Sequence, residues 1–169
     1  MILTKKGKDM SKVLVAYFTA SGNTKKVAEE ICKVENGDLY EIRPETPYTA
    51  KDLDYTIKDS RANLEMADES CRPAIVNDCD SVADYDTIFV GFPVWWGREP
   101  SIVDTFLEKF DLSGKKVVPF CTSGGSGAAK ATEHIKAVVG ENVTVEEGKR
   151  LGADASEEEI RTWKKLLGE

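Results

Sequence analysis

Runs of apolar residues alternate with amphipathic stretches along the chain, and this alternation predicts its elements. Residues 12–18, 87–94 and 115–121 are nearly continuous apolar runs, which are typical of strands buried on both faces of a parallel sheet. Residues 38–43 alternate between apolar and polar and predict another strand, and residues 142–145 begin a further one. The pattern therefore predicts five strands.

Helices are predicted between and after these strands, where apolar residues recur at helical spacing. Ser156 and Glu159 form a capping box that marks the start of the last helix. The other predicted helices cover residues 24–33, about 51–66, 100–110 and 128–139. Residues 44–83 are the least regular part of the chain, because a polar connection follows the predicted helix there.

Strands that alternate with helices favour an α/β fold, with a parallel sheet covered by helices on both faces and right-handed crossovers. Ligands of such sheets bind outside the carboxyl ends of the strands, where the strand order reverses. The loops after Phe18, Val94 and Cys121 are therefore the candidate site. A chain of 169 residues suits one domain. We expect this domain to span residues 12–169, with residues 1–11 as an N-terminal tail.

Composition and charge exclude several classes of function. The net charge of −7 argues against nucleic acid as a partner. No run of about 20 apolar residues predicts a membrane span, and the N-terminus lacks the apolar core of a signal peptide, so we expect a cytoplasmic protein. Four cysteines without a CxxC pair and a single histidine predict reduced thiols and no metal site. His134 is expected on a helix surface.

The first loop reads TASGNT and brings hydroxyl and amide side chains to a helix start. Free N–H groups at a helix N-terminus attract anions, and Gly22 allows close approach of the backbone. The loop lacks the Lys and the second Gly of the triphosphate and dinucleotide motifs. It therefore suits the phosphate of a mononucleotide such as FMN, unless Asn23 or Thr24 simply caps the helix. The candidate residues are Thr19, Ala20, Ser21, Gly22, Asn23 and Thr24.

The second loop, GFPVWWGREP, places two adjacent tryptophans at the carboxyl end of a strand. Exposed tryptophans are uncommon without a use, and a flat isoalloxazine ring needs a stacking surface. Which tryptophan would stack, and whether both only fill the end of the sheet, stays open at this point. The candidate residues are Pro93, Val94, Trp95, Trp96 and Gly97.

The third loop, CTSGGSG, is rich in glycine and permits close approach of its backbone to a ring edge. A flexible turn is the alternative. A cysteine phosphatase would need an arginine where Gly127 stands, so Cys121 is not expected to be a nucleophile. The candidate residues are Thr122, Ser123, Gly124, Gly125 and Gly127.

The first loop resembles the phosphate loop of the flavodoxin family, written [ST]-x-T-G-x-T-x-x-x-A. Thr19, Gly22, Thr24 and Ala28 fit this pattern, and Ser21 keeps the hydroxyl of the usual threonine. The PVWWG segment is similar to loops of a larger branch of the family. The resemblance implies a three-layer α/β sandwich with a five-stranded parallel sheet in the order 2-1-3-4-5 and FMN as cofactor. It also implies that the backbone at Gly97 reorients when the flavin gains a proton.

Two redox functions are compatible with this resemblance. One is electron transfer to a partner protein, and the other is NAD(P)H-dependent reduction of quinone-like acceptors, by a monomer or a homodimer. Electron-carrying flavodoxins commonly have a tyrosine in the third loop, and its absence here favours a reductase slightly. A signalling receiver domain would need acidic residues where Thr19 and Pro93 stand. Further residues that could line an open flavin face are Tyr48, Tyr55, Arg61 and Glu65.

Overall fold

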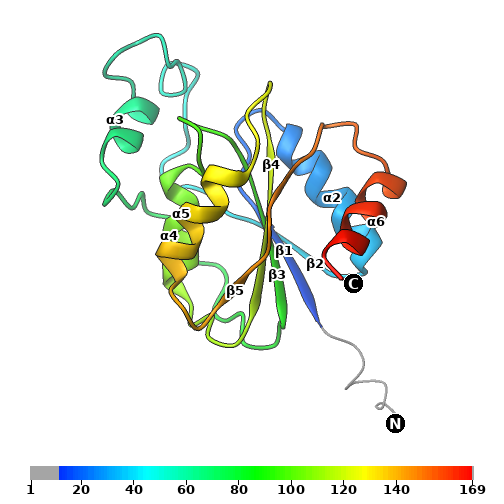
Figure 1. The fold of residues 1–169 in the computed structure, drawn as a ribbon. Helices are drawn as coiled ribbons and strands as arrows, with labels where there is room; N and C mark the ends of the chain where they lie inside the picture. The colour runs from blue at the N-terminus through cyan, green and yellow to red at the C-terminus, as the bar shows by residue number, and fades with distance from the viewer. Residues whose placement is uncertain (1–11, 169) are drawn as a thin grey trace.

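The computed structural model describes residues 12–168, and its centre is a parallel β-sheet (Figure 1). The predicted tail, residues 1–11, lies outside the described residues. The strands stand in the order β2-β1-β3-β4-β5, which confirms the expected order. Their bounds are β1 Val13–Tyr17, β2 Asp38–Glu41, β3 Thr87–Pro93, β4 Lys116–Thr122, β5 Thr144–Val145 and β6 Lys149–Arg150.

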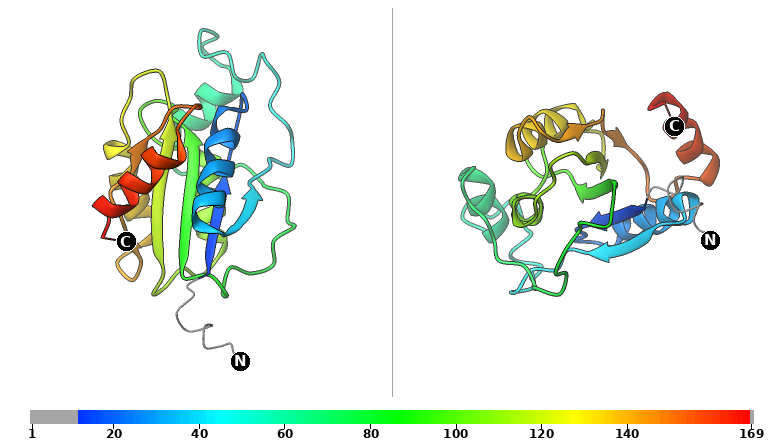
Figure 2. Two further views of the ribbon diagram at one scale, coloured as in Figure 1. Left: turned by 90° about the vertical axis from the view of Figure 1, so that its right-hand side faces the viewer. Right: turned by 90° about the horizontal axis from the view of Figure 1, so that it is seen from below.

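Helices cover both faces of the sheet and complete three layers (Figure 2). Helices α2 (Asn23–Glu35) and α6 (Glu157–Leu166) pack together on one face. Helices α4 (Ser101–Lys109) and α5 (Ala129–Val139) pack together on the other. The short helix α3 (Arg61–Ala67) lies on the α4/α5 side, toward the carboxyl ends of the strands. Among residues 12–168, no helix is long and apolar enough to cross a membrane.

Strand β1 is buried from both sides, as its apolar run predicts. Successive side chains of a strand point to opposite faces of a sheet. Leu14 and Ala16 accordingly join the core beneath α4 and α5, whereas Val15 and Tyr17 join the core beneath α2 and α6. The two cores lie back to back across the sheet, so the loops at its end are held from both faces.

The fifth strand is formed in two pieces, β5 and β6, which both pair with β4. The N–H of Glu146 donates to the carbonyl of Val117, and the N–H of Leu151 donates to the carbonyl of Cys121. Pro119 stands midway between these two acceptors and has no N–H to donate. Proline interrupts a ladder in this way, and residues 146–148 leave the sheet where it stands.

The predicted helix over residues 51–66 is wrong over most of its length, because only Arg61–Ala67 is helical. Thr49 and Asp52 exchange hydrogen bonds between their side chains and backbone N–H groups. Asp54 accepts another such bond from the N–H of Thr56. Local bonds of this kind compete with helix formation. The helix begins only after Ser60, whose hydroxyl accepts from the N–H of Asn63.

Candidate functional site

The first loop brings an uncapped helix N-terminus to the end of β1. Gly22 is the N-cap residue of α2, with a φ of 97°, a left-handed conformation that glycine adopts readily. Within the described chain no side chain caps this end, and the first turn carries no acidic residue. The capping alternative for Asn23 and Thr24 is therefore wrong. The leading N–H groups of α2 stay available to an anion.

The hydroxyl groups of the first loop have two different roles. Thr19 Oγ1 accepts a hydrogen bond of 2.9 Å from the N–H of Gly22 and fixes the turn. Thr24 is buried, with an exposed fraction of 1%, and its Oγ1 lies 2.8 Å from Oγ1 of Thr122 in the third loop. Ser21 and Asn23 are exposed. The loop thus exposes the polar side chains of Ser21 and Asn23 to solvent, while buried Thr24 bonds it to the third loop.

The second loop contains a tight turn from Trp95 to Arg98. Each of these two residues donates its N–H to the carbonyl of the other, at 2.9 and 3.1 Å. Trp96 and Gly97, between them, have φ values of 54° and 82°. Two successive left-handed residues define a type I′ turn. Such a conformation is costly for a tryptophan, about 1 kcal/mol or more.

The turn sends the two tryptophans into different environments. Trp95 is half-buried and packs edge-on against Phe18 and Tyr48, with ring centroids 5.6 Å from each. Trp96 is 54% exposed, and its Nε1 donates to Oδ1 of Asn63 on α3 at 3.0 Å. Trp95 therefore supports the loop from the core, and Trp96 is the aromatic surface that the loop presents.

The third loop is open on its outer side. At Gly124, Gly125 and Gly127, an added Cβ would meet no described atom within 4 Å. Ser123 Oγ donates to the carbonyl of Ser126 at 2.6 Å. Arg150 of β6 donates through Nε to the carbonyl and the hydroxyl of Ser123, at 3.3 and 3.1 Å. Arg150 was missed by sequence reasoning, because β6 is too short to give a recognisable strand pattern.

The three loops meet at one end of the sheet because β1, β3 and β4 are parallel neighbours. Pro93 pairs with Thr122 across the β3–β4 ladder, and the N–H of Val94 donates to the carbonyl of Thr122 at 3.0 Å. The first loop is joined to the third by the hydrogen bond between Thr24 and Thr122. The sixteen predicted residues therefore surround one end of the sheet, and among them the Trp95 side chain is turned toward the core.

Three of the four additional candidates form a cluster of their own. The hydroxyl of Tyr48 donates to Oε1 of Glu65 at 2.6 Å, and Arg61 Nε donates to Oε2 of the same carboxylate at 2.9 Å. The Arg61 guanidinium lies 3.8 Å above the Tyr48 ring. Burial and the Glu65 carboxylate raise the pKa of Tyr48. The cluster braces the connection before β3 against Trp95, whereas Tyr55 is 78% exposed.

A group of buried charges lies beneath the second loop, and sequence reasoning missed it. Glu99 and Asp104 are both 0% exposed, and His134 Nδ1 forms a hydrogen bond with Oε2 of Glu99. Arg98 Nη1 lies 3.6 Å from Oδ2 of Asp104. The expected surface position of His134 is therefore wrong, since its side chain is only 20% exposed. No sequence signal links these residues, because they come from three separate segments.

This group also bears on the expected absence of a metal site. Ligand atoms of Glu99, Asp104 and His134 lie within 4.8 Å of one another, which is close enough to hold a cation. However, the Arg98 guanidinium already supplies a positive charge to the same carboxylates. Burial and the neighbouring Glu99 also raise the pKa of Asp104 well above its ordinary value, so this carboxyl keeps its proton near neutral pH. We therefore treat the group as a buried polar cluster that joins the second loop to α4 and α5.

The family model for flavodoxin matches residues 12–167, nearly the whole described chain. The chain belongs to the flavodoxin family. The chain is also similar to two proteins of known structure, a candidate flavoprotein and a flavoprotein that was solved with FMN. The one from Bacteroides eggerthii is 42% identical, with 94% of this chain and 99% of that chain covered and a TM-score of 0.89. The FMN complex of a Lactobacillus acidophilus flavoprotein is 26% identical, with 91% and 99% covered and a TM-score of 0.71.

Two curated relatives of the chain are named as enzymes. The NAD(P)H dehydrogenase (quinone) of Cupriavidus metallidurans is 30% identical over 129 residues, which is 74% of this chain and 59% of that protein. The protein of the same name from Chromohalobacter salexigens is 27% identical over 134 residues. The chain thus spans 59% and 60% of the lengths of these two relatives.

Proposed function

We propose that this flavodoxin-family protein binds FMN at its three loops and catalyses NAD(P)H-dependent reduction of quinone-like acceptors. The uncapped N-terminus of α2 beside free hydroxyl and amide side chains carries the proposal, because this donor set suits a phosphate monoester. The FMN complex of the Lactobacillus acidophilus relative supports the choice of cofactor. The names of the two curated relatives support the choice of reaction.

The residues of the other two loops fit the rest of the cofactor. Trp96 offers an exposed flat ring on a rigid turn, and flat aromatic rings stack well on one another. Around Gly124 and Gly125 no described atom would obstruct a ring edge from approaching the backbone. FMN would supply the electron and hydride transfer, so the protein needs no acid–base pair of its own. Its residues bind the phosphate, orient the ring and leave one face open.

The open face favours a reductase over an electron carrier. No aromatic residue follows Cys121 within the third loop, so one side of the flavin ring is left without an aromatic cover there. The alternative function is an electron carrier that docks to a redox partner. It is supported by the net charge of −7, because an acidic surface suits docking to a basic partner. A cytoplasmic location is part of the proposal under either function.

The proposal is tested with purified protein and added FMN. We expect a yellow complex and steady oxidation of NADH or NADPH when a quinone is present. A complex that binds FMN but oxidises NAD(P)H no faster than free FMN does would favour the carrier. A protein that is colourless after incubation with FMN and removal of the unbound flavin would contradict both functions.

Thr24→Ala is expected to weaken FMN binding by about 1–3 kcal/mol, which corresponds to roughly 5- to 150-fold in Kd. The substitution removes a buried hydroxyl beside the phosphate loop and leaves Thr122 without its partner. Flavin fluorescence quenching measures Kd, and thermal unfolding of the FMN-free protein measures any structural cost.

Thr24→Ser is the matched control, because it keeps the hydroxyl and should bind FMN nearly as the wild type does. If Thr24→Ala lowers thermal stability but leaves the FMN Kd unchanged, the hydroxyl only joins the two loops and does not serve the phosphate.

A further inference from the structure

A cavity of about 910 Å³ lies between the second loop and the connection that leads from β2 to β3. One wall is made by Val94, Trp95 and Trp96, and the opposite wall by residues 53–67, which include α3. Cavities that bind small molecules have about 300–1,000 Å³ and mostly apolar walls. This cavity fits that description, and no residue of the first loop lines it.

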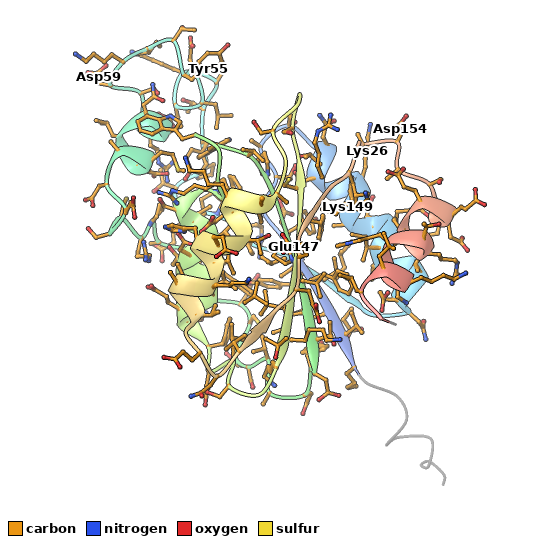
Figure 3. The ribbon with its side chains drawn as sticks, in the orientation of Figure 1. Lys26, Tyr55, Asp59, Glu147, Lys149 and Asp154 are labelled. Carbon is orange, nitrogen blue, oxygen red and sulfur yellow. The ribbon has the colours of Figure 1, made fainter. Side chains whose placement is uncertain are left out.

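Exposed apolar side chains gather around this cavity. Five large apolar side chains are exposed among the described residues, and three of them, Tyr55, Leu64 and Trp96, line it. Tyr55 lies on the segment before α3 at the upper left of Figure 3, on the opposite side of the molecule from α6. Apolar groups gathered in one hollow indicate a binding site, whereas scattered ones need no explanation.

Asn63 holds the two walls of the cavity together. Its Nδ2 donates to the carbonyls of Tyr55 and Ile57, at 2.9 Å each. Its Oδ1 accepts from Nε1 of Trp96 at 3.0 Å. The amide is 9% exposed and uses both of its ends, so the irregular segment before α3 is fixed to the second loop. The cavity is therefore pre-formed, which reduces the entropy cost of binding.

Lys58 is the one charged side chain among the described residues that line the cavity. A single ammonium group at the edge of an apolar cavity suits a carbonyl or ionised oxygen on an otherwise apolar molecule. It does not suit a cation. The lining thus selects for a flat apolar ring system that carries an electronegative oxygen.

We propose that this cavity is the acceptor site, which holds a naphthoquinone-sized molecule with its rings against Leu64 and the apolar residues of the α3 wall and an oxygen near Lys58. This inference rests on the proposed function for its redox role. In the overall reaction NAD(P)H gives a hydride and solvent gives a proton, so that NAD(P)+ and the hydroquinone are formed. Because Trp96 belongs both to the cavity and to the second loop, the acceptor would lie next to the flavin site.

The first test measures binding of 2,3-dimethyl-1,4-naphthoquinone, whose blocked ring positions prevent reaction with thiols. Titrations with the FMN-free and the FMN-loaded protein give its Kd, and turnover with NADPH gives its KM. Leu64→Ala is expected to raise both by about fivefold or more, because it removes half-exposed apolar area from the wall. Leu166→Ala on α6 is the matched control, since Leu166 is 80% exposed and lies outside the cavity.

Two outcomes would overturn the acceptor site. One is an unchanged quinone Kd in Leu64→Ala. The other is loss of quinone binding when FMN saturates the protein, which would assign the cavity to the flavin ring. Failure of the proposed function would look different, because FMN binding or NADPH turnover would be absent. Failure of the acceptor site is judged separately, from the quinone Kd of the FMN-free protein.

Lys58→Met tests the polar end of the site. It is expected to weaken binding of ionised 2-hydroxy-1,4-naphthoquinone by about threefold, a size typical of an exposed charge. Binding of the uncharged dimethyl compound should not change. Lys165→Met, on α6, is the control for the altered net charge. Equal weakening by both lysine variants would show that only overall charge matters and would contradict the placement of the oxygen.

Discussion

Gly91→Ala is expected to lower the free energy of unfolding by about 1–3 kcal/mol, because it overpacks the centre of the sheet. Gly91 lies in β3 between Tyr17 of β1 and Phe120 of β4. A Cβ at this position would lie 2.1 Å from Cζ of Phe120, a side chain with an exposed fraction of 0%. Strands paired on both sides cannot move apart to relieve this contact. Equilibrium unfolding in urea measures the effect.

Two variants separate this clash from other effects of an added methyl group. Gly124→Ala is a matched control, because no described atom lies within 4 Å of its added Cβ, and we expect stability within about 0.5 kcal/mol of the wild type. Phe120→Leu should destabilise the protein by itself but partly rescue Gly91→Ala. Additive losses in the double variant would mean that the ring does not cause the effect.

Asp104→Asn is expected to stabilise the protein increasingly as the pH rises from 5 to 9. Burial, followed by the neighbouring Glu99, raises the pKa of Asp104 to about 9. The folded state therefore holds a proton that the unfolded state releases above its ordinary pKa of 3.8. The stability that this proton gives is complete at low pH and is lost as the pH rises through 9. Asparagine needs no proton, so it avoids this loss.

The slope of the difference between variant and wild type should approach about 1.4 kcal/mol per pH unit at most. Charged groups that face Asp104 reduce this slope. They come from the second loop, from α5 and from the connection after α3. They are Arg98, Glu99, His134 and Arg72. Urea unfolding at several pH values measures the difference, with the exposed Asp84→Asn as control. A difference that stays constant from pH 5 to 9 would refute the raised pKa.

The strands and the three loops could be predicted from the sequence because their signals are local. Apolar runs mark the strands, and a parallel sheet brings the loops after Phe18, Val94 and Cys121 to one end. The helix expected over residues 51–66 failed for an equally local reason, since Thr49, Asp52 and Asp54 hold the backbone in turns.

Other features depend on contacts between distant segments. Trp95 and Trp96 are identical in type, but Trp96 takes the left-handed backbone of the turn and is exposed, whereas Trp95 packs against Phe18 and Tyr48. The pairing of His134 with Glu99 joins α5 to the second loop, across 35 positions of sequence. Periodicity contains no information about such a partner, so the buried cluster is visible only in the folded chain.

The hydrogen bond between Thr24 and Thr122 has a consequence for how this protein can change over evolution. It joins the loop proposed to hold the phosphate to the loop proposed to border the ring, over a separation of 98 positions. Residues in direct contact seldom contribute additively to stability or binding. Substitutions that adjust the ring environment through the third loop should therefore also alter the hold on the phosphate, so affinity and ring environment evolve together.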